Sequence, residues 1–128
     1  MLRIAITVLF LLSLSQVAAS AAEENGRYAV RGVGSYACKT VQGHFSDESD
    51  ATRNEARQIY TAWISGYLSA INRLSADTFD SFPAAYDEPV LLIALSQCKQ
   101  NPDQMFEQVV NDILAVFHPL RVISQSPV

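Results

Sequence analysis

The chain has 128 residues, of which 49% are hydrophobic, and its 13 Asp and Glu against 9 Lys and Arg give a net charge of −4. This length corresponds to a single domain. A net acidic chain whose few basic residues form no stripe is a poor candidate for binding nucleic acid or an anionic membrane. The sequence contains no C-x-x-C motif, which argues against thiol redox chemistry as its function.

The first 21 residues are expected to be a secretory signal peptide. Arg3 is the only charge before Glu23, and an apolar run extends from Ile4 to Leu14. This run is shorter than the roughly 20 residues that cross a bilayer, and the small residues of Ala19-Ser20-Ala21 fit a cleavage site. Cleavage after Ala19 and an uncleaved anchor are the alternatives. A mature chain from residue 22 has 107 residues, with eight Lys and Arg against thirteen Asp and Glu, a side-chain charge of −5.

The two cysteines, Cys38 and Cys98, are expected to form a disulfide, because an even number of cysteines in an exported chain favours one. Only one intramolecular pairing exists. It would close a loop of about 60 residues, for which chain entropy gives a stabilisation of roughly 4 kcal/mol. The alternative is two buried free thiols.

The mature chain is expected to begin with an extended arm over residues 22–34, since Gly26, Gly32 and Gly34 disfavour a helix. Ser35 is a candidate cap for a short helix over residues 35–43, which would present Cys38 to the core.

A long helix is predicted next, starting at a capping box of Thr52 and Glu55. Its apolar residues recur at helical spacing: Ile59, Tyr60, Trp63, Ile64, Tyr67, Leu68, Ile71 and Leu74. Ala62, Gly66 and Ala70 form a neighbouring strip of small residues where another helix is expected to approach. Glycine inside a helix costs about 1 kcal/mol relative to alanine, so Gly66 is expected to have a packing role.

Two further helices are predicted after a loop over residues 77–86, in which Phe79 and Phe82 are expected to fold over the core. Asp87 caps the first, with Pro89 in its first turn, and its nearly all-round apolar sequence predicts a central, buried helix. Asn101-Pro102 predicts the start of the second, which Pro119 ends. The prediction is an all-α bundle of one short and three longer helices over residues 35–119, with a loose tail over residues 120–128.

Groups able to carry chemistry are few in this sequence. His44 and His118 are expected to be exposed, and the acidic residues after His44 (Asp47, Glu48 and Asp50) are interpreted as a solvated loop rather than a metal site. We therefore expect no catalysis, no metal and no cofactor.

A candidate surface for binding or packing follows the aromatic stripe and the predicted loop. Its residues are Tyr60, Trp63, Gly66, Tyr67, Asn72, Phe79 and Phe82. Such a stripe on an amphipathic helix usually packs in a core. Asn72 is equally compatible with a buried hydrogen-bonding role and with exposure.

Three motifs resemble a group of small exported bacterial proteins related to HdeA. They are G-x-G-x-x-x-C from Gly32 to Cys38, W-I-S-G-Y-L-S-A-I-N from Trp63 to Asn72, and C-x-x-N-P from Cys98 to Pro102. The resemblance implies a periplasmic helical domain with one disulfide that acts as an acid-stress chaperone. It also implies a folded homodimer near neutral pH that loosens in acid, exposes apolar surface and holds unfolding client proteins.

The chain also resembles immunity proteins of type VI secretion of the Rap/Tai kind, which are small, exported, helical and disulfide-bonded. That resemblance implies a protein partner of another type, a toxin that the immunity protein binds and blocks. For the chaperone, charge arithmetic is favourable: in strong acid the side-chain charge of the mature chain passes from −5 to about +10, and self-repulsion loosens a small domain.

Overall fold

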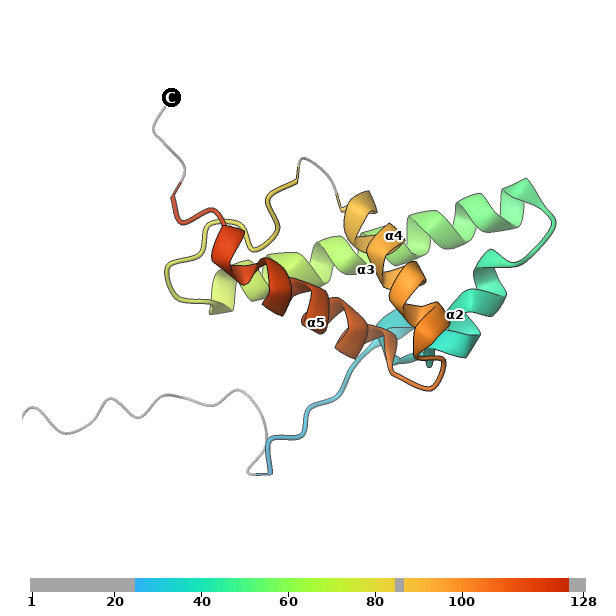
Figure 1. The fold of residues 1–128 in the computed structure, drawn as a ribbon, viewed down its shortest axis with the longest axis horizontal. Coiled ribbons are helices and arrows are strands. Elements are labelled where there is room, and N and C mark those ends of the chain that lie inside the picture. Colours follow the sequence, from blue (N-terminus) through green and yellow to red (C-terminus); the bar gives the residue numbers. More distant parts are fainter. Residues whose placement is uncertain (1–24, 85–86, 125–128) are drawn as a thin grey trace, which may run out of the picture.

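A computed structural model describes residues 25–84 and 87–124 of the chain (Figure 1). Within these residues the elements are η1 (Gly32–Ser35), α2 (Cys38–Phe45), α3 (Asp50–Leu74), α4 (Glu88–Gln100), α5 (Phe106–Phe117) and η2 (His118–Leu120), where η denotes a 3-10 helix. The predicted all-α fold of one short and three longer helices is confirmed. The predicted signal peptide lies outside the described residues.

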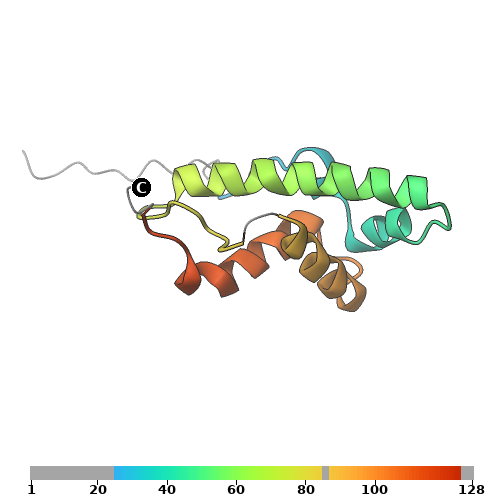
Figure 2. The same ribbon diagram turned by 90° about the horizontal axis from the view of Figure 1, so that it is seen from above.

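The α-helices form two layers (Figure 2). The long helix α3 makes one layer, α4 and α5 make the other, and α2 lies at one end. Helix α4 contacts α2, α3 and α5, in keeping with the central position expected from its apolar sequence. It is not covered on every side, because Leu92 is half exposed. In the described part of the chain, no helix combines the length and the apolar character needed to cross a membrane.

The core joins all four α-helices and contains the disulfide. Its largest fully buried side chains are Tyr60, Phe106, Ile64, Leu91, Ile113 and Val41. Cys38 at the start of α2 is bonded to Cys98 near the end of α4, and both are fully buried. The predicted disulfide is therefore confirmed, and its 60-residue separation corresponds to about 4 kcal/mol of chain-entropy stabilisation.

A turn before α5 caps the start of α2, beside the disulfide. The backbone N–H of Cys38 donates to the carbonyl of Gln104 at 2.8 Å, and that of Lys39 donates to Pro102 at 2.7 Å. These bonds satisfy donors that a helix N-terminus leaves without an intrahelical partner. The predicted start of the last helix at Asn101-Pro102 is therefore wrong: the segment stays a turn, and α5 begins at Phe106.

Two predicted helix caps are also wrong. Helix α3 begins at Asp50, because the Ser49 hydroxyl, rather than that of Thr52, accepts from a first-turn backbone N–H. Helix α2 begins at Cys38, since the Ser35 hydroxyl donates to the carbonyl of Gly32 at 2.8 Å and closes η1 instead. Residues 32–34 were predicted to belong to the extended arm. They form part of the 3-10 helix η1 instead.

The loop between α3 and α4 is fastened to the C-terminal segment. Phe82 is buried against Phe117, with ring centroids 4.8 Å apart, whereas Phe79 is half exposed. Val122 exchanges backbone hydrogen bonds with Asp80, at 2.8 and 3.1 Å. The prediction of a loose tail is therefore wrong as far as Val122.

Candidate binding groove

The N-terminal arm docks on the side chain of Trp63. The indole Nε1–H donates to the carbonyl of Arg31 at 2.8 Å. Gly34 is buried against the same ring, and a Cβ built on Gly34 would lie 2.0 Å from Trp63 Cζ2. Gly32 has a φ of +64°, which glycine adopts without strain. The G-x-G pattern therefore fits a turn that must approach the indole closely.

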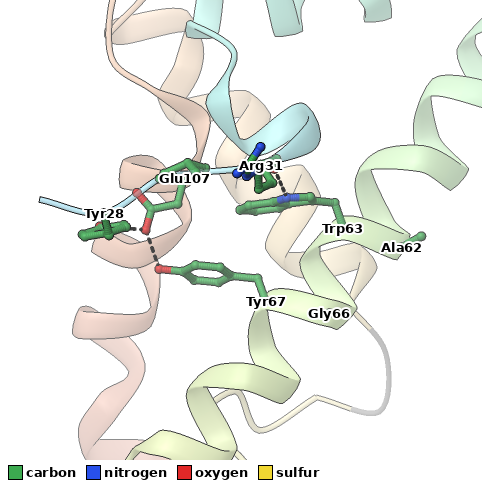
Figure 3. Close-up of a pocket in the computed structure, with 9 residues that line it drawn as sticks. Tyr28, Arg31, Ala62, Trp63, Gly66, Tyr67 and Glu107 are labelled. Atoms are coloured by element: carbon green, nitrogen blue, oxygen red, sulfur yellow. Dashed lines mark hydrogen bonds between the residues drawn. The ribbon is translucent and has the colours of Figure 1, made fainter. Parts of the chain in front are cut away.

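Beside this docking point lies a groove of about 400 Å³ between the arm, α3 and α5. We call it the arm groove. It is lined by Tyr28, Ala29, Val30, Arg31, Ala62, Trp63, Gly66, Tyr67 and Glu107. Figure 3 shows Tyr28 from the arm and Tyr67 from α3 converging on the carboxylate of Glu107 in the first turn of α5.

Glu107 holds the arm and α3 together, although only 2% of its surface is exposed. Its Oε1 accepts from the hydroxyl of Tyr67 at 2.7 Å and from that of Tyr28 at 3.1 Å. A buried carboxylate is costly unless it is hydrogen-bonded, so these two bonds are what make the position tolerable. Tyr67 also stacks on Trp63, with ring centroids 5.1 Å apart.

Both tyrosines of the groove are held in their protonated form. Burial raises the pKa of Tyr67 well above its usual value, and the hydrogen bond and negative charge of Glu107 add to the effect. Desolvation likewise raises the pKa of Tyr28, again with a contribution from Glu107. The two hydroxyls therefore remain hydrogen-bond donors to Glu107 at neutral pH.

Of the candidate surface residues named from the sequence, Trp63, Gly66 and Tyr67 line the arm groove. The other four lie elsewhere. Tyr60 is in the core, and Asn72 fastens the α3–α4 loop by accepting from the backbone N–H and the hydroxyl of Ser81 at 2.8 and 2.6 Å.

The expectation that Gly66 lets another helix approach is wrong. A Cβ built there meets no atom of the described residues within 4 Å. Ala62 and Ala70, on the same strip, are exposed. The strip of small residues is an open surface beside the groove rather than a helix contact.

Sequence reasoning missed Glu107 and Tyr28. A signal for Glu107 was present, because it precedes the buried Val110 and Leu114 by three and seven residues. That spacing places it on the core-facing side of α5. Tyr28 carried no such signal, since nothing in an extended arm indicates which side chain will meet a residue 79 positions away.

The histidines and acidic residues named from the sequence do not come together to form a metal site. His44 is exposed on α2, as expected, and its Nδ1 is 2.9 Å from the hydroxyl of Tyr60. Asp47 accepts from the backbone N–H of Ser49, and Asp50 is paired with Arg53. In residues 25–84 and 87–124, no three His, Cys, Asp or Glu side chains are grouped so that they could hold a metal ion.

The fold and the groove together define a small all-α domain with one buried disulfide and an aromatic groove beside its N-terminal arm. No protein-family model, curated protein or solved structure matches the chain.

Proposed function

We propose that this chain is an exported, non-catalytic protein-binding domain of the periplasm that acts as an acid-stress chaperone, as its resemblance to HdeA-like proteins implies. The observation that carries the binding role is the arm groove, with its aromatic walls and buried carboxylate. The disulfide supports the location, because such bonds persist in oxidising compartments.

The way in which the arm is held supports a surface that opens. Within the described residues, Tyr28, Ala29 and Val30 make no backbone–backbone hydrogen bond. The arm is fastened at the groove by the bonds of Tyr28 to Glu107 and of Trp63 to Arg31. A hydrogen bond to a charged group contributes about 1.5–3 kcal/mol net and a neutral one about 1 kcal/mol, so self-repulsion in acid has only a few kcal/mol to overcome in breaking these two bonds. The disulfide would keep the rest of the domain from opening fully.

The test of the chaperone role is aggregation of a client protein that unfolds in acid. The protein purified from the periplasm of an expressing host is expected to suppress light scattering by the client below about pH 3, where loss of packing exposes apolar surface. Suppression is expected to vanish at neutral pH. If protection in acid equals that of an inert protein of similar size, the chaperone role is wrong.

The second candidate function is immunity to a type VI secretion toxin, which the shape of the groove favours. A concave site with a fixed carboxylate suits one specific partner better than it suits many unfolded clients. The immunity role predicts a stable complex at neutral pH with an effector encoded beside this gene. Size-exclusion chromatography of the two purified proteins tests it, and separate elution would remove this candidate.

A further inference from the structure

The carboxylate of Glu107 is buried, and it forms no ion pair with any of the described residues. The ion pairs between described residues join Lys39 to Asp103, Arg53 to Asp50 and Arg57 to Glu88, all at exposed positions. Both hydrogen bonds to Glu107 fall on Oε1, and Oε2 accepts none from the described residues. Burying a carboxylate is favourable only when hydrogen bonds and an opposite charge together replace its hydration. Among the described residues, the hydrogen bonds to Oε1 are present but the opposite charge is not, and Oε2 is not counted among the fully buried atoms that lack a partner.

The groove beside Glu107 has room for a side chain that would supply the missing positive charge and a hydrogen bond to Oε2. Its volume of about 400 Å³ falls in the range of sites that bind ligands. The small residues Ala62 and Gly66 form one wall of the groove, and no atom of the described residues lies within 4 Å of a Cβ added at Gly66. Tyr28 and Tyr67 contribute aromatic rings, whose faces attract a cation.

The arm next to the groove offers a backbone edge. The backbone groups of Tyr28, Ala29 and Val30 pair with no other backbone group in the described part of the chain. An extended peptide recognises such an edge by main-chain hydrogen bonds, while its side chains enter adjacent pockets. A protein segment uses both features of the site, the free edge and the charged groove, whereas a small amine uses only the second.

We propose that the arm groove binds an extended segment of a partner protein by taking one Arg or Lys side chain of that segment, whose cation pairs with Glu107. This inference depends on the proposed protein-binding function and specifies the chemistry of the partner. The net charge of −4 favours the approach of a basic segment. Arg31 lines the groove and has the same positive charge as the incoming side chain, so it is expected to oppose binding. Removing the charge of Arg31 therefore tests the electrostatic pairing in the opposite direction to removing that of Glu107.

Trp63 is the only tryptophan of the chain, so its fluorescence reports directly on the groove. The probes are three blocked pentapeptides, acetyl-Gly-Gly-X-Gly-Gly-amide with X as Arg, Lys or norleucine, and butylguanidinium as a small cation without a backbone. The Arg and Lys peptides are expected to change the emission saturably. The norleucine peptide, which keeps the apolar stem but lacks the charge, is expected to bind at least about ten times more weakly.

Two groove variants and one matched control separate charge pairing from general attraction. Glu107→Gln keeps an acceptor for both tyrosines and is expected to weaken the Arg peptide about 10- to 100-fold. Asp112→Asn removes the same charge from an exposed position on the same helix and is expected to change affinity less than about twofold. Arg31→Gln is expected to strengthen binding. Circular dichroism and urea unfolding establish that each variant is folded.

Three outcomes would overturn the inference. They are equal binding of the Arg and norleucine peptides, equal loss of affinity in Glu107→Gln and Asp112→Asn, and binding of butylguanidinium as tight as that of the Arg peptide, which would make the groove a small-molecule site. If the peptides fail but the protein still suppresses client aggregation or binds an effector, the inference is wrong and the proposed function stands. If those assays fail too, both are wrong.

Discussion

The disulfide end of the molecule and the arm groove are held by different forces. At the disulfide end, Cys38 and Cys98 are joined covalently, fully buried and flanked by backbone bonds from the turn before α5. At the groove, the contacts between described residues that hold the arm include two side-chain hydrogen bonds and the packing of Gly34 on Trp63. Regions with few buried apolar contacts open at low free-energy cost. The arm at the groove, which we call the edge, is therefore expected to open at a lower free-energy cost than the disulfide-bonded scaffold.

The largest expected effect comes from removing the covalent restraint. The double substitution Cys38→Ala and Cys98→Ala is expected to lower the free energy of unfolding by about 4 kcal/mol, because a 60-residue loop is no longer closed in the unfolded chain. Urea unfolding followed by circular dichroism measures the loss. Tyr67→Phe, which removes a hydrogen bond to the buried carboxylate of Glu107, is the comparison and is expected to cost about 1.5–3 kcal/mol. Equal losses in the two proteins would contradict the division into scaffold and edge.

A smaller effect is expected at the seat of the arm. Gly34→Ala would place a Cβ 2.0 Å from Trp63 Cζ2, so the turn or the indole must move, at a cost of about 1–3 kcal/mol. Exposure of the indole is expected to shift its fluorescence emission to longer wavelength. The same change at Gly66, where a Cβ meets no atom of the described residues within 4 Å, is expected to stabilise α3 by up to about 1 kcal/mol.

This pair of glycine variants has a clear opposite outcome. If Gly34→Ala leaves both the unfolding free energy and the tryptophan emission unchanged, the arm is not seated on Trp63 in solution. If Gly66→Ala destabilises the protein by as much as Gly34→Ala, then Gly66 has a packing contact, and the description of Gly66 as part of an open surface beside the groove is wrong.

The scaffold was predictable from the sequence because its signals are repeated and local. Helical periodicity from Ile59 to Leu74 predicted α3 from many positions at once, and two cysteines allow only one pairing. Helix starts were less predictable. Asn101-Pro102 is a typical helix start, but the backbone carbonyls of Pro102 and Gln104 are used to cap α2, and this tertiary demand overrides the local signal.

The groove was only partly predictable, because its parts come from three distant segments. Trp63 and Tyr67 belong to an apolar stripe of the kind that any amphipathic helix shows. Helical periodicity therefore identified both residues, but it could not predict that they line a groove rather than pack in the core. Tyr60, on the same stripe, is buried. The position of the arm distinguishes the groove residues Trp63 and Tyr67 from the core residue Tyr60. That position depends on the fit of Gly34 to Trp63 and on the hydrogen bond of Tyr28 to Glu107. Neither contact is encoded by local spacing.

The smallest effect concerns alkaline pH, and it compares a tyrosine of the core with one of the groove. Burial raises the pKa of Tyr60 from 10.0 to about 12, and burial together with Glu107 raises that of Tyr67 as well. The folded chain therefore holds these protons more tightly than the unfolded chain, so unfolding releases protons above pH 10. The stability contributed by the two groups is complete below pH 10 and is lost as pH rises through the folded pKa values.

The urea concentration at the midpoint of unfolding is expected to decrease as the pH is raised from 9 to 11.5. The decrease is expected to be less steep in Tyr60→Phe and in Tyr67→Phe. Each substitution removes one proton that the folded state retains, so the double variant should show the flattest profile. A profile in Tyr67→Phe as steep as that of the unsubstituted chain would mean that the arm leaves the groove before the core unfolds, exposing Tyr67 to titration in the folded state. That result would place the weaker restraint at the arm more directly than any stability measurement at neutral pH, because it separates release of the arm from unfolding of the disulfide-bonded scaffold.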